Sequence, residues 1–434
     1  MEYRKPASRR PWTWVPSLYF AEGIPYAIAM TVSVVMYKRL GISNADIALY
    51  TSWLYLPWVI KPFWSPFVDM LRTKRFWIVA MQVLIGAALG SVALTLPGPD
   101  FFRYTLCVFW IMAFSSATHD VAADGFYMLG LQQYQQAAFI GIRSMFYRIA
   151  MIAAQGGLVV LAGFLEARGS CTVAAWSTSF LIAAGIFLCL AFYHSFILPC
   201  PVSDKAAKRR LSVSFASAYL HTFALYFKRK DILAVLAFFL FYRFAEAQLV
   251  KMVAPFLLDA RTRGGLGLST AEAGWVYGTI GTVMLVVGGI FGGIAVSRKG
   301  LKFWLWIMVF AMHLPDLIFV YLSWAMPDNM LVISAAVAAE QFGYGFGFTA
   351  YSLFMIMVSE GEYKTVHYAV STGFMALGMM IPGMFSGWVQ ELTGYRYFFL
   401  WIILSTIPGF IVPAIVKIDP DFGRKREGQG CHGD

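Results

Sequence analysis

The sequence predicts an all-α polytopic membrane protein of about twelve transmembrane helices, and two observations predict it. Of the 434 residues, 59% are hydrophobic and only 13% are charged, whereas roughly 25% of an ordinary soluble domain is charged. The apolar residues also form successive stretches long enough to cross about 30 Å of hydrocarbon as helices. These stretches run from end to end, so the chain has no room for a soluble catalytic domain.

The expected spans follow from hydropathy and lie near residues 12–37, 46–68, 76–96, 102–128, 138–164, 174–198, 232–258, 271–296, 301–322, 330–358, 365–390 and 395–417. The first span contains Glu22 and two prolines and lacks a small-residue cleavage site, so we expect a retained helix and no cleaved signal peptide. The five cysteines have no CxxC or Cys/His spacing. They indicate neither a disulfide framework nor a metal site, and no cofactor is expected.

The basic residues, which give a net charge of +11, concentrate in segments that alternating spans place on one side of the membrane. These are the N-terminal tail, the connections after the second, sixth and eighth spans, and the C-terminal tail. The positive-inside rule therefore puts both termini in the cytoplasm, and we expect an inner-membrane protein. Because the cations lie at the membrane surface, they do not indicate a nucleic-acid partner.

The connection 199–231 divides six expected spans from six. We expect an N-terminal bundle over 1–198, a cytoplasmic linker over 199–231 with a possible amphipathic helix at 211–227, a C-terminal bundle over 232–420, and a flexible tail over 421–434. Monomers are the default for this architecture.

The two halves repeat one another at matching positions. Phe20-Ala21-Glu22-Gly23 in the first span corresponds to Phe244-Ala245-Glu246-Ala247 in the seventh. The segments 40–46 and 266–272 both contain Ser-x-x-acid, which predicts a serine-capped helix start with an acid near the positive end of the helix dipole. Capping chemistry used twice by chance is the alternative, but further similarity between 65–75 and 293–300 favours duplication. Two related bundles around a central site fit alternating access.

The connection after the second span resembles the loop signature of the major facilitator superfamily, with Ser65 in place of the leading glycine and Met70 in place of the first cation. The resemblance implies a cytoplasmic gating loop, whose charged residues here and after the eighth span are Asp69, Arg72, Lys74, Arg75, Arg298 and Lys299.

Charged residues within spans are expected to have a partner, a cavity or a function, because each costs about 2.5–3.5 kcal/mol on insertion scales. Asp120 and Asp124 lie on one face of the fourth span. With span ends near Met128 and Ala138, Asp120 and Arg148 lie roughly 12 Å and 15 Å deep. We expect them to pair, with Arg143 nearer the surface. The pair either locks the bundle or lets a carboxylate load and unload a proton.

Other buried charges carry open interpretations. Glu22, Glu246 and Arg243 lie in equivalent spans and are either cavity contacts or structural pairs, and His119 precedes Asp120. Weaker candidates are Lys61, Glu340, His313 and Asp316, of which the last two flank Pro315 and could satisfy a kinked backbone.

Aromatic residues make up 17% of the chain. Those that could stack on sugar rings in a cavity are Tyr26, Tyr147, Tyr242 and Tyr344, although helix contacts and membrane interfaces also absorb aromatics. Gly343, Gly345 and Gly347 follow no strand and precede no lysine, so they indicate close helix packing and not a phosphate loop.

Several segments together resemble the AmpG-type muropeptide permeases, whose relatives include acetyl-CoA transporters. They are 20–25, 61–69, Asp120-Val121-Ala122-Ala123-Asp124, 147–151, 241–247 and the stretch 367–388. The resemblance covers most of the chain. It implies import of anhydro-muropeptides, which are sugar-peptide fragments of the cell wall, on the proton gradient, with Asp120, Asp124 and Arg148 on family motifs.

The chain differs from many relatives at Gly125-Phe126-Tyr127, where an aromatic and an arginine are common, and it lacks the extra spans of some members. Three other functions therefore remain open. The first is a carrier of another anionic conjugate such as an acyl-CoA-like solute. The second is a membrane-embedded transferase with a His119–Asp120 dyad, and the third is a solute sensor. Repeated bundles favour a transporter over an enzyme.

Overall fold

The computed structural model describes residues 10–131, 133–201, 204, 221, 223–360, 364–420, 422 and 423, and every regular element in these residues is a helix. The chain divides into two units. Unit 1 comprises Met1–Ser212 and Leu268–Thr279, and unit 2 comprises Val213–Gly267 and Ile280–Asp434. Most of the expected linker, including nearly all of the possible amphipathic helix at 211–227, and most of the expected tail 421–434 lie outside the described residues.

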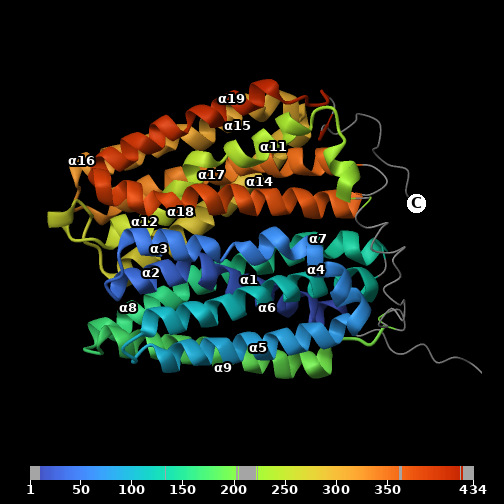
Figure 1. The fold of residues 1–434 in the computed structure, drawn as a ribbon, viewed down its shortest axis with the longest axis horizontal. Coiled ribbons are helices and arrows are strands. Elements are labelled where there is room, and N and C mark those ends of the chain that lie inside the picture. The colour runs from blue at the N-terminus through green and yellow to red at the C-terminus, as the bar shows by residue number, and fades with distance from the viewer. Residues whose placement is uncertain are drawn as a thin grey trace, which may run out of the picture. The chain divides into compact units, whose positions relative to one another are not determined.

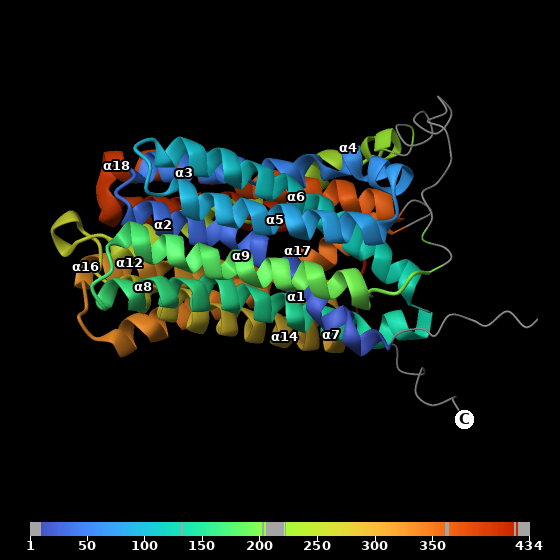
Figure 2. The ribbon, with the colours of Figure 1, turned by 90° about the horizontal axis from the view of Figure 1, so that it is seen from below.

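Unit 1 contains the first six expected spans (Figures 1 and 2). They are formed by η1 (Pro11–Thr13), α1 (Val15–Ala27), η2 (Ile28–Val32) and α2 (Ser33–Arg39); α3 (Asn44–Trp53) and α4 (Leu56–Leu71); α5 (Lys74–Thr95); α6 (Phe101–Gly130); α7 (Gln133–Ile152), η3 (Ala153–Leu158) and α8 (Val159–Ala167); and α9 (Thr172–Ile197). Helix α5 packs between α6 and α9, and α1 packs on α7.

Unit 2 contains most of the later helices. They are α11 (Ile232–Phe241), α12 (Phe244–Leu258), η4 (Arg261–Arg263), α14 (Thr282–Lys299), α15 (Leu301–His313), η6 (Leu314–Asp316), α16 (Leu317–Ala325), α17 (Met330–Ser359), α18 (Lys364–Ser405) and α19 (Ile407–Ile415). The eighth span starts in unit 1 with α13 (Thr270–Ala273) and η5 (Gly274–Gly281), and η5 crosses the division between the units.

Ten helical segments of the described chain are long and apolar enough to cross a membrane. One of them, Val366–Ile415, holds both of the last two expected spans, and the helix turns between them at Gly394, where φ is 72°. The only expected span outside these ten segments is 46–68, which forms α3 and α4 with a break at Leu54 and Tyr55. The all-helical fold class is therefore confirmed.

Both predicted capping motifs are present. Ser43 Oγ accepts a hydrogen bond from the Asp46 backbone N–H at 3.0 Å. Ser269 and Glu272 form a complete capping box at the start of α13, in which the Glu272 carboxylate accepts from the Ser269 backbone N–H at 2.8 Å. Each motif satisfies backbone donors that a helix start leaves free.

Glycines bring α17 into close contact with two neighbours in unit 2. A Cβ at Gly345 would lie 2.0 Å from the Leu285 carbonyl oxygen of α14, and a Cβ at Gly343 would lie 2.1 Å from the Ala311 carbonyl oxygen of α15. Both distances are far below van der Waals contact, so only glycine fits. The interpretation of this glycine series as a helix-packing feature is confirmed.

The helices carry large apolar side chains outward and several charged side chains inward. Phe192 on α9 is 70% exposed and Leu331 on α17 is 79% exposed, whereas Glu22, Glu246 and Asp316 are buried. This distribution suits a hydrocarbon solvent, in which exposed apolar groups cost nothing and charges need an internal partner. The protein is a multi-pass membrane protein.

The described cysteines are Cys107, Cys171, Cys189 and Cys200, and all four are free and exposed. Cys431 lies outside the described residues.

Candidate functional site

Two carboxylates on α6 lie at the centre of a charged network in unit 1. The Lys61 ammonium group of α4 donates to Asp120 Oδ2. One turn further along α6, Asp124 Oδ1 accepts from Arg143 Nη2 of α7 at 2.7 Å and from the Tyr19 hydroxyl of α1 at 3.1 Å. The spacing of four residues puts both carboxylates on one face of α6, as the sequence predicts, and together they contact side chains of α1, α4 and α7.

Glu22 adds a third carboxyl group to this network. Its side chain is 7% exposed and lies close enough to the Asp120 and Asp124 carboxylates to interact with both electrostatically, while Glu22 Oε2 has no partner among the described residues. Ionised carboxylates repel one another, so a proton on one of these groups would relieve the repulsion. We call Glu22, Lys61, Asp120, Asp124 and Arg143 the unit 1 charge network.

Aromatic side chains hold the network in place. The Arg143 guanidinium lies over the ring of Tyr19 at 4.4 Å and over that of Tyr127 at 5.2 Å, distances at which cation–π attraction is effective. Tyr19 and Glu22 are three residues apart on α1 and so share one face of that helix. Arg143 is fixed by a carboxylate on one side and by rings on the other.

Access to the network falls from one end to the other. The Asp124 side chain is 43% exposed and that of Arg143 is 28% exposed, whereas Lys61 and Asp120 are 20% and 17% exposed. Glu22 is nearly buried. Asp124 is therefore the most exposed carboxylate of the network and Glu22 the most buried.

The expected pairing of Asp120 with Arg148 is wrong. Helix α7 begins at Gln133, five residues before the expected start, and α6 ends at Gly130. At about 1.5 Å per residue, this earlier start moves Arg148 more than one helical turn deeper and brings Arg143 toward the depth expected for Arg148. The described partners of Asp120 and Asp124 are Lys61 and Arg143.

Sequence reasoning gave Lys61 only a weak role and did not single out Tyr19. Two signals could have found them. Lys61 is a single lysine within an apolar span, which is costly unless it is paired. Tyr19 precedes Glu22 by three residues and so faces the same neighbours.

His119 belongs to a buried chain of hydrogen bonds beside the charge network. His194 Nδ1 donates to Gln82 Oε1 at 2.9 Å, and Gln82 Nε2 donates to His119 Nε2 at 2.9 Å. Ser17 of α1 lies 2.9 Å from His194 Nε2. Because His119 Nε2 accepts from Gln82, His119 is neutral. Since His119 Nε2 bonds to Gln82 and Asp120 bonds to Lys61, the pairing that a His119–Asp120 dyad needs is absent from the described contacts.

The aromatic candidates divide into two groups. Tyr26 is partly buried, and its ring centroid lies 5.2 Å from that of Trp58. Tyr147 lies near enough to Glu22 and Asp120 to interact with them electrostatically. Tyr242 is fully buried and donates to the Gly347 carbonyl at 3.0 Å, and its role in sugar stacking stays a prediction. Tyr344 accepts a hydrogen bond from Arg243.

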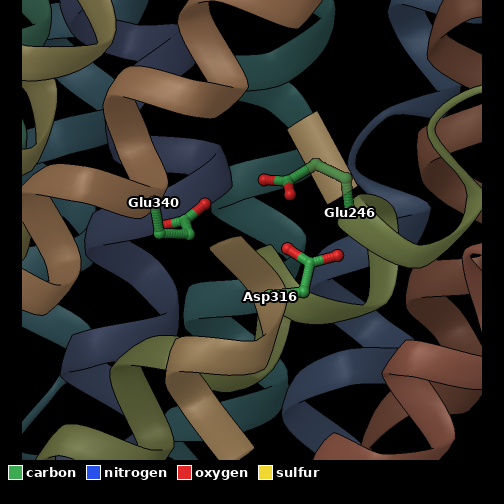
Figure 3. Close-up of side chains that lie close together, drawn as sticks. All are labelled: Glu246, Asp316 and Glu340. Atoms are coloured by element: carbon green, nitrogen blue, oxygen red, sulfur yellow. The ribbon is translucent and has the colours of Figure 1, made fainter. Parts of the chain in front are cut away.

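In unit 2, Arg243 immediately precedes α12 and Glu246 lies in the first turn of this helix, and the two side chains have different surroundings. The Arg243 guanidinium lies 4.6 Å from the Phe348 ring centroid. Glu246 instead faces Asp316 and Glu340, and all three carboxyl groups are buried (Figure 3). The sequence predicts that Glu246 is either a cavity contact or a member of a structural pair. In the structure it belongs to a cluster of acids.

The predicted gating loop of unit 1 is tied to the chain that follows the sixth span. Asp204 accepts hydrogen bonds from the backbone N–H groups of Lys74 at 2.8 Å and Arg75 at 3.1 Å. The Arg75 side chain donates to the Ser195 carbonyl and to Cys200 Sγ, the latter at 2.8 Å. An acid at the first turn of α5 also interacts favourably with the helix dipole.

The remaining residues of the predicted loops lie at helix ends. The Arg72 guanidinium lies 5.6 Å from the Phe76 ring centroid, and Lys299 lies over Phe303 at 4.5 Å. Arg298 is exposed at the end of α14, and the Asp69 side chain lies outside the described part of the structure. Their role in gating stays a prediction.

Comparison with known sequences finds transporters. The sequence profile of the BT1 family matches residues 22–344. The anhydromuropeptide permease of Escherichia coli K12 is 24% identical over 420 residues, which cover 94% of this chain and 80% of the permease. The Rickettsia conorii transporter named AmpG 4 is 25% identical over 415 residues, which cover 91% of this chain and 94% of that protein.

Comparison with solved structures finds the same architecture. The D-xylose–proton symporter superposes with a TM-score of 0.70 at 11% identity, covering 95% of this chain and 98% of the symporter. The nucleoside transporter NupG superposes with a TM-score of 0.66 at 18% identity, covering 93% and 98%. At these identities the likeness shows the fold alone, which is that of the major facilitator superfamily.

Proposed function

The chain belongs to the BT1 family, and we propose that this membrane transporter imports anhydro-muropeptides together with protons by alternating access. The printed names of its relatives support a muropeptide as the solute. Those relatives are permeases, and the chain is a transporter and not an enzyme.

One observation carries the proton part of the proposal: the unit 1 charge network holds three carboxyl groups and two basic groups. With all five ionised, the network has one unbalanced negative charge, and a single proton neutralises it. That proton would also relieve the repulsion between the neighbouring Glu22 and Asp120 carboxylates. The network can therefore gain or lose one proton between two well-paired arrangements.

The Arg143–Asp124 pair links the proton to the solute. The peptide part of a muropeptide carries carboxylates, which an arginine binds well. When Asp124 takes up a proton, Arg143 loses its carboxylate partner and becomes free to bind a solute carboxylate. When Asp124 releases the proton, the pair re-forms and the solute leaves. Proton and solute then travel together.

The aromatic side chains near the network suit the sugar part of the solute. Tyr26 and Tyr147 are only partly buried, and each belongs to a helix that contributes to the unit 1 charge network. Sugar rings have apolar faces that stack on aromatic rings. In this proposal Tyr26 and Tyr147 contact the disaccharide while Arg143 binds the peptide.

The bacterial relatives support a bacterial inner membrane, and the distribution of basic segments supports termini in the cytoplasm. We assign a monomer as the working unit, because the charge network draws all of its members from one unit of one chain.

The test measures uptake of a radiolabelled anhydro-disaccharide-peptide into proteoliposomes with an acidic exterior and a negative interior. Wild type should accumulate the solute, and Asp124→Asn should not. The same variant should keep solute exchange without a gradient, because the asparagine amide cannot carry a proton but leaves Arg143 free. Asp100→Asn is the matched control, since Asp100 is an exposed carboxylate of the same unit.

The possible failures are separable. If folded wild type takes up no muropeptide, the solute assignment is wrong, and an acyl-CoA-like anionic conjugate is the next solute to test. If Asp120→Asn and Asp124→Asn both accumulate solute as wild type does, the unit 1 charge network does not carry the proton.

A further inference from the structure

Three carboxyl groups from separate elements meet inside unit 2 (Figure 3). Glu246 belongs to α12, Asp316 to η6 and Glu340 to α17, and each side chain is 1% exposed. One oxygen atom from each residue lies within 4.8 Å of the others. We call these three residues the unit 2 acid cluster.

Most of the oxygens in this cluster have no hydrogen-bond partner in the described structure. Both oxygens of Glu246 and both of Asp316 are buried and unpartnered. Only Glu340 is satisfied, because Gln341 Nε2 donates to its two oxygens at 2.9 Å and 3.3 Å. Buried carboxylates without a donor or a counter-charge are strongly unfavourable, so these atoms require a positively charged ligand or protons.

The surrounding side chains do not neutralise the cluster. Arg243 is the basic group that acts electrostatically on Glu246, and it also donates to the Tyr344 hydroxyl. His313 Nδ1 lies 3.9 Å from Asp316 Oδ2, beyond hydrogen-bond distance. With the three acids ionised and Arg243 positive, the group is short of two positive charges.

We propose that the unit 2 acid cluster binds a hard metal cation through oxygen atoms of Glu246, Asp316 and Glu340. Carboxylate oxygens are the ligands that hard cations prefer. The charge balance favours a divalent ion, which would bring the cluster and Arg243 together to neutrality.

The spacing of the oxygens selects for ion size. An ion at the centre of three oxygens within 4.8 Å of one another lies at most about 2.8 Å from each, close to the usual range of about 2.3–2.6 Å for Ca²⁺. Mg²⁺ needs distances of about 2.0–2.1 Å in a near-octahedral arrangement. Glu246, Asp316 and Glu340 come from packed elements and would have to move further inward for the smaller ion. We therefore expect Ca²⁺ to bind more tightly than Mg²⁺.

Backbone geometry explains how Asp316 joins the cluster. Pro315 interrupts the ninth span, which passes from α15 through the short 3₁₀-helix η6 into α16. A proline removes a backbone hydrogen bond and breaks the regular turn. The break turns Asp316 away from the direction that a continuous helix would give it and toward Glu246 and Glu340 (Figure 3).

This inference goes beyond the proposed function, because it concerns unit 2 and the binding of a metal ion without transport. The test is equilibrium binding of ⁴⁵Ca²⁺ to the purified full-length protein in lipid nanodiscs after treatment with a chelator. Mg²⁺ and Na⁺ are competitors in separate arms, and choline keeps the ionic strength constant. Nanodiscs of neutral lipid without protein give the background.

Wild type should bind Ca²⁺ saturably at one site per chain. Asp316→Asn and Glu340→Gln should each weaken binding at least about tenfold, since each removes a charged ligand. Glu391→Gln is the matched control, because Glu391 is an exposed carboxylate of α18 in the same unit, and its binding should equal wild type. Binding of Na⁺ in place of Ca²⁺, lost in the same variants, also supports a metal site and assigns a monovalent ion.

A second measurement works on wild type alone, in case a variant does not fold. If the unoccupied cluster holds protons, binding of a metal ion must displace them, so addition of Ca²⁺ to the weakly buffered protein should release protons in proportion to the ion bound. Absence of saturable binding of all three cations by folded wild type would overturn the proposal, as would equal binding by wild type, Asp316→Asn and Glu340→Gln.

Discussion

Lys61 and Asp120 show how a buried ion pair depends on both partners. Lys61→Met leaves Asp120 without its cation, and we expect a loss of about 1–3 kcal/mol in unfolding free energy. This is less than the roughly 3–5 kcal/mol for a fully buried pair, because both side chains are partly exposed. The measurement is denaturant or thermal unfolding in detergent.

The double variant Lys61→Met/Asp120→Asn is the control for this prediction. With both charges removed, it should recover most of the stability lost in Lys61→Met. A double variant as unstable as the sum of the two single variants would mean that the pair does not contribute through its charges.

Gln82 forms hydrogen bonds with two buried histidines, and its replacement should remove both bonds. Gln82→Leu removes the hydrogen bonds to His119 Nε2 and His194 Nδ1 and leaves these two nitrogens without partners. Each unsatisfied buried group costs about 1–3 kcal/mol, so we expect a clear fall in the unfolding temperature.

Thr118→Val is a suitable comparison for Gln82→Leu. The Thr118 hydroxyl donates only to the carbonyl one turn back in its own helix, so its removal should change stability by less than about 0.5 kcal/mol. Equal effects of the two substitutions would contradict a structural role for the histidine chain.

At the scale of elements, the packing of α14 on α17 depends on glycine. A Cβ at Gly288 would lie 2.1 Å from the Phe342 carbonyl oxygen, whereas a Cβ at Gly293 on the same helix has no atom within 4 Å. Gly288→Ala should therefore destabilise the protein by about 1–3 kcal/mol through backbone shifts. The experiment compares the unfolding temperatures of the two alanine variants.

Gly293→Ala provides the internal reference in that comparison. It should be neutral or slightly stabilising, because alanine is favoured over glycine in a helix by about 1 kcal/mol. If Gly288→Ala left the unfolding temperature equally unchanged, the close packing of α14 on α17 would not contribute measurably to stability.

The sequence predicts these elements well and their side-chain partners poorly. Hydropathy locates the helices because hydrocarbon demands long apolar stretches, and capping motifs locate two of their starts. The partner of Asp120 is harder to predict, because a shift of five residues in the start of α7 exchanges Arg148 for Arg143 at the same depth. Depth alone also misses Lys61, which reaches Asp120 from a different helix.

The unit 2 acid cluster could be predicted only in part for a related reason. Glu246, Asp316 and Glu340 each stand out as charges within spans, but they are far apart in sequence and lie on three separate elements. Their meeting depends on the break at Pro315, and a hydropathy profile carries no information about its direction.

For the whole molecule, the proposed proton coupling predicts a fixed ratio of protons to solute molecules. Three acids and two bases are balanced by one proton, so we expect one proton to enter with each solute molecule. The ratio follows from the pH gradient that just cancels a known solute gradient in proteoliposomes at controlled membrane potential. A ratio of two or more would require a second proton site outside the unit 1 charge network.

The exposed position of the four described cysteines makes the transporter suitable for spectroscopic labelling. Surface substitutions away from special contacts change stability by about 0.5 kcal/mol or less, so Cys107, Cys171 and Cys189 can be replaced by alanine. Cys200 needs serine instead, because its side chain accepts a hydrogen bond from Arg75. With Cys431 also replaced, new cysteines could carry spin labels or fluorophores that follow a transport cycle without competing thiols.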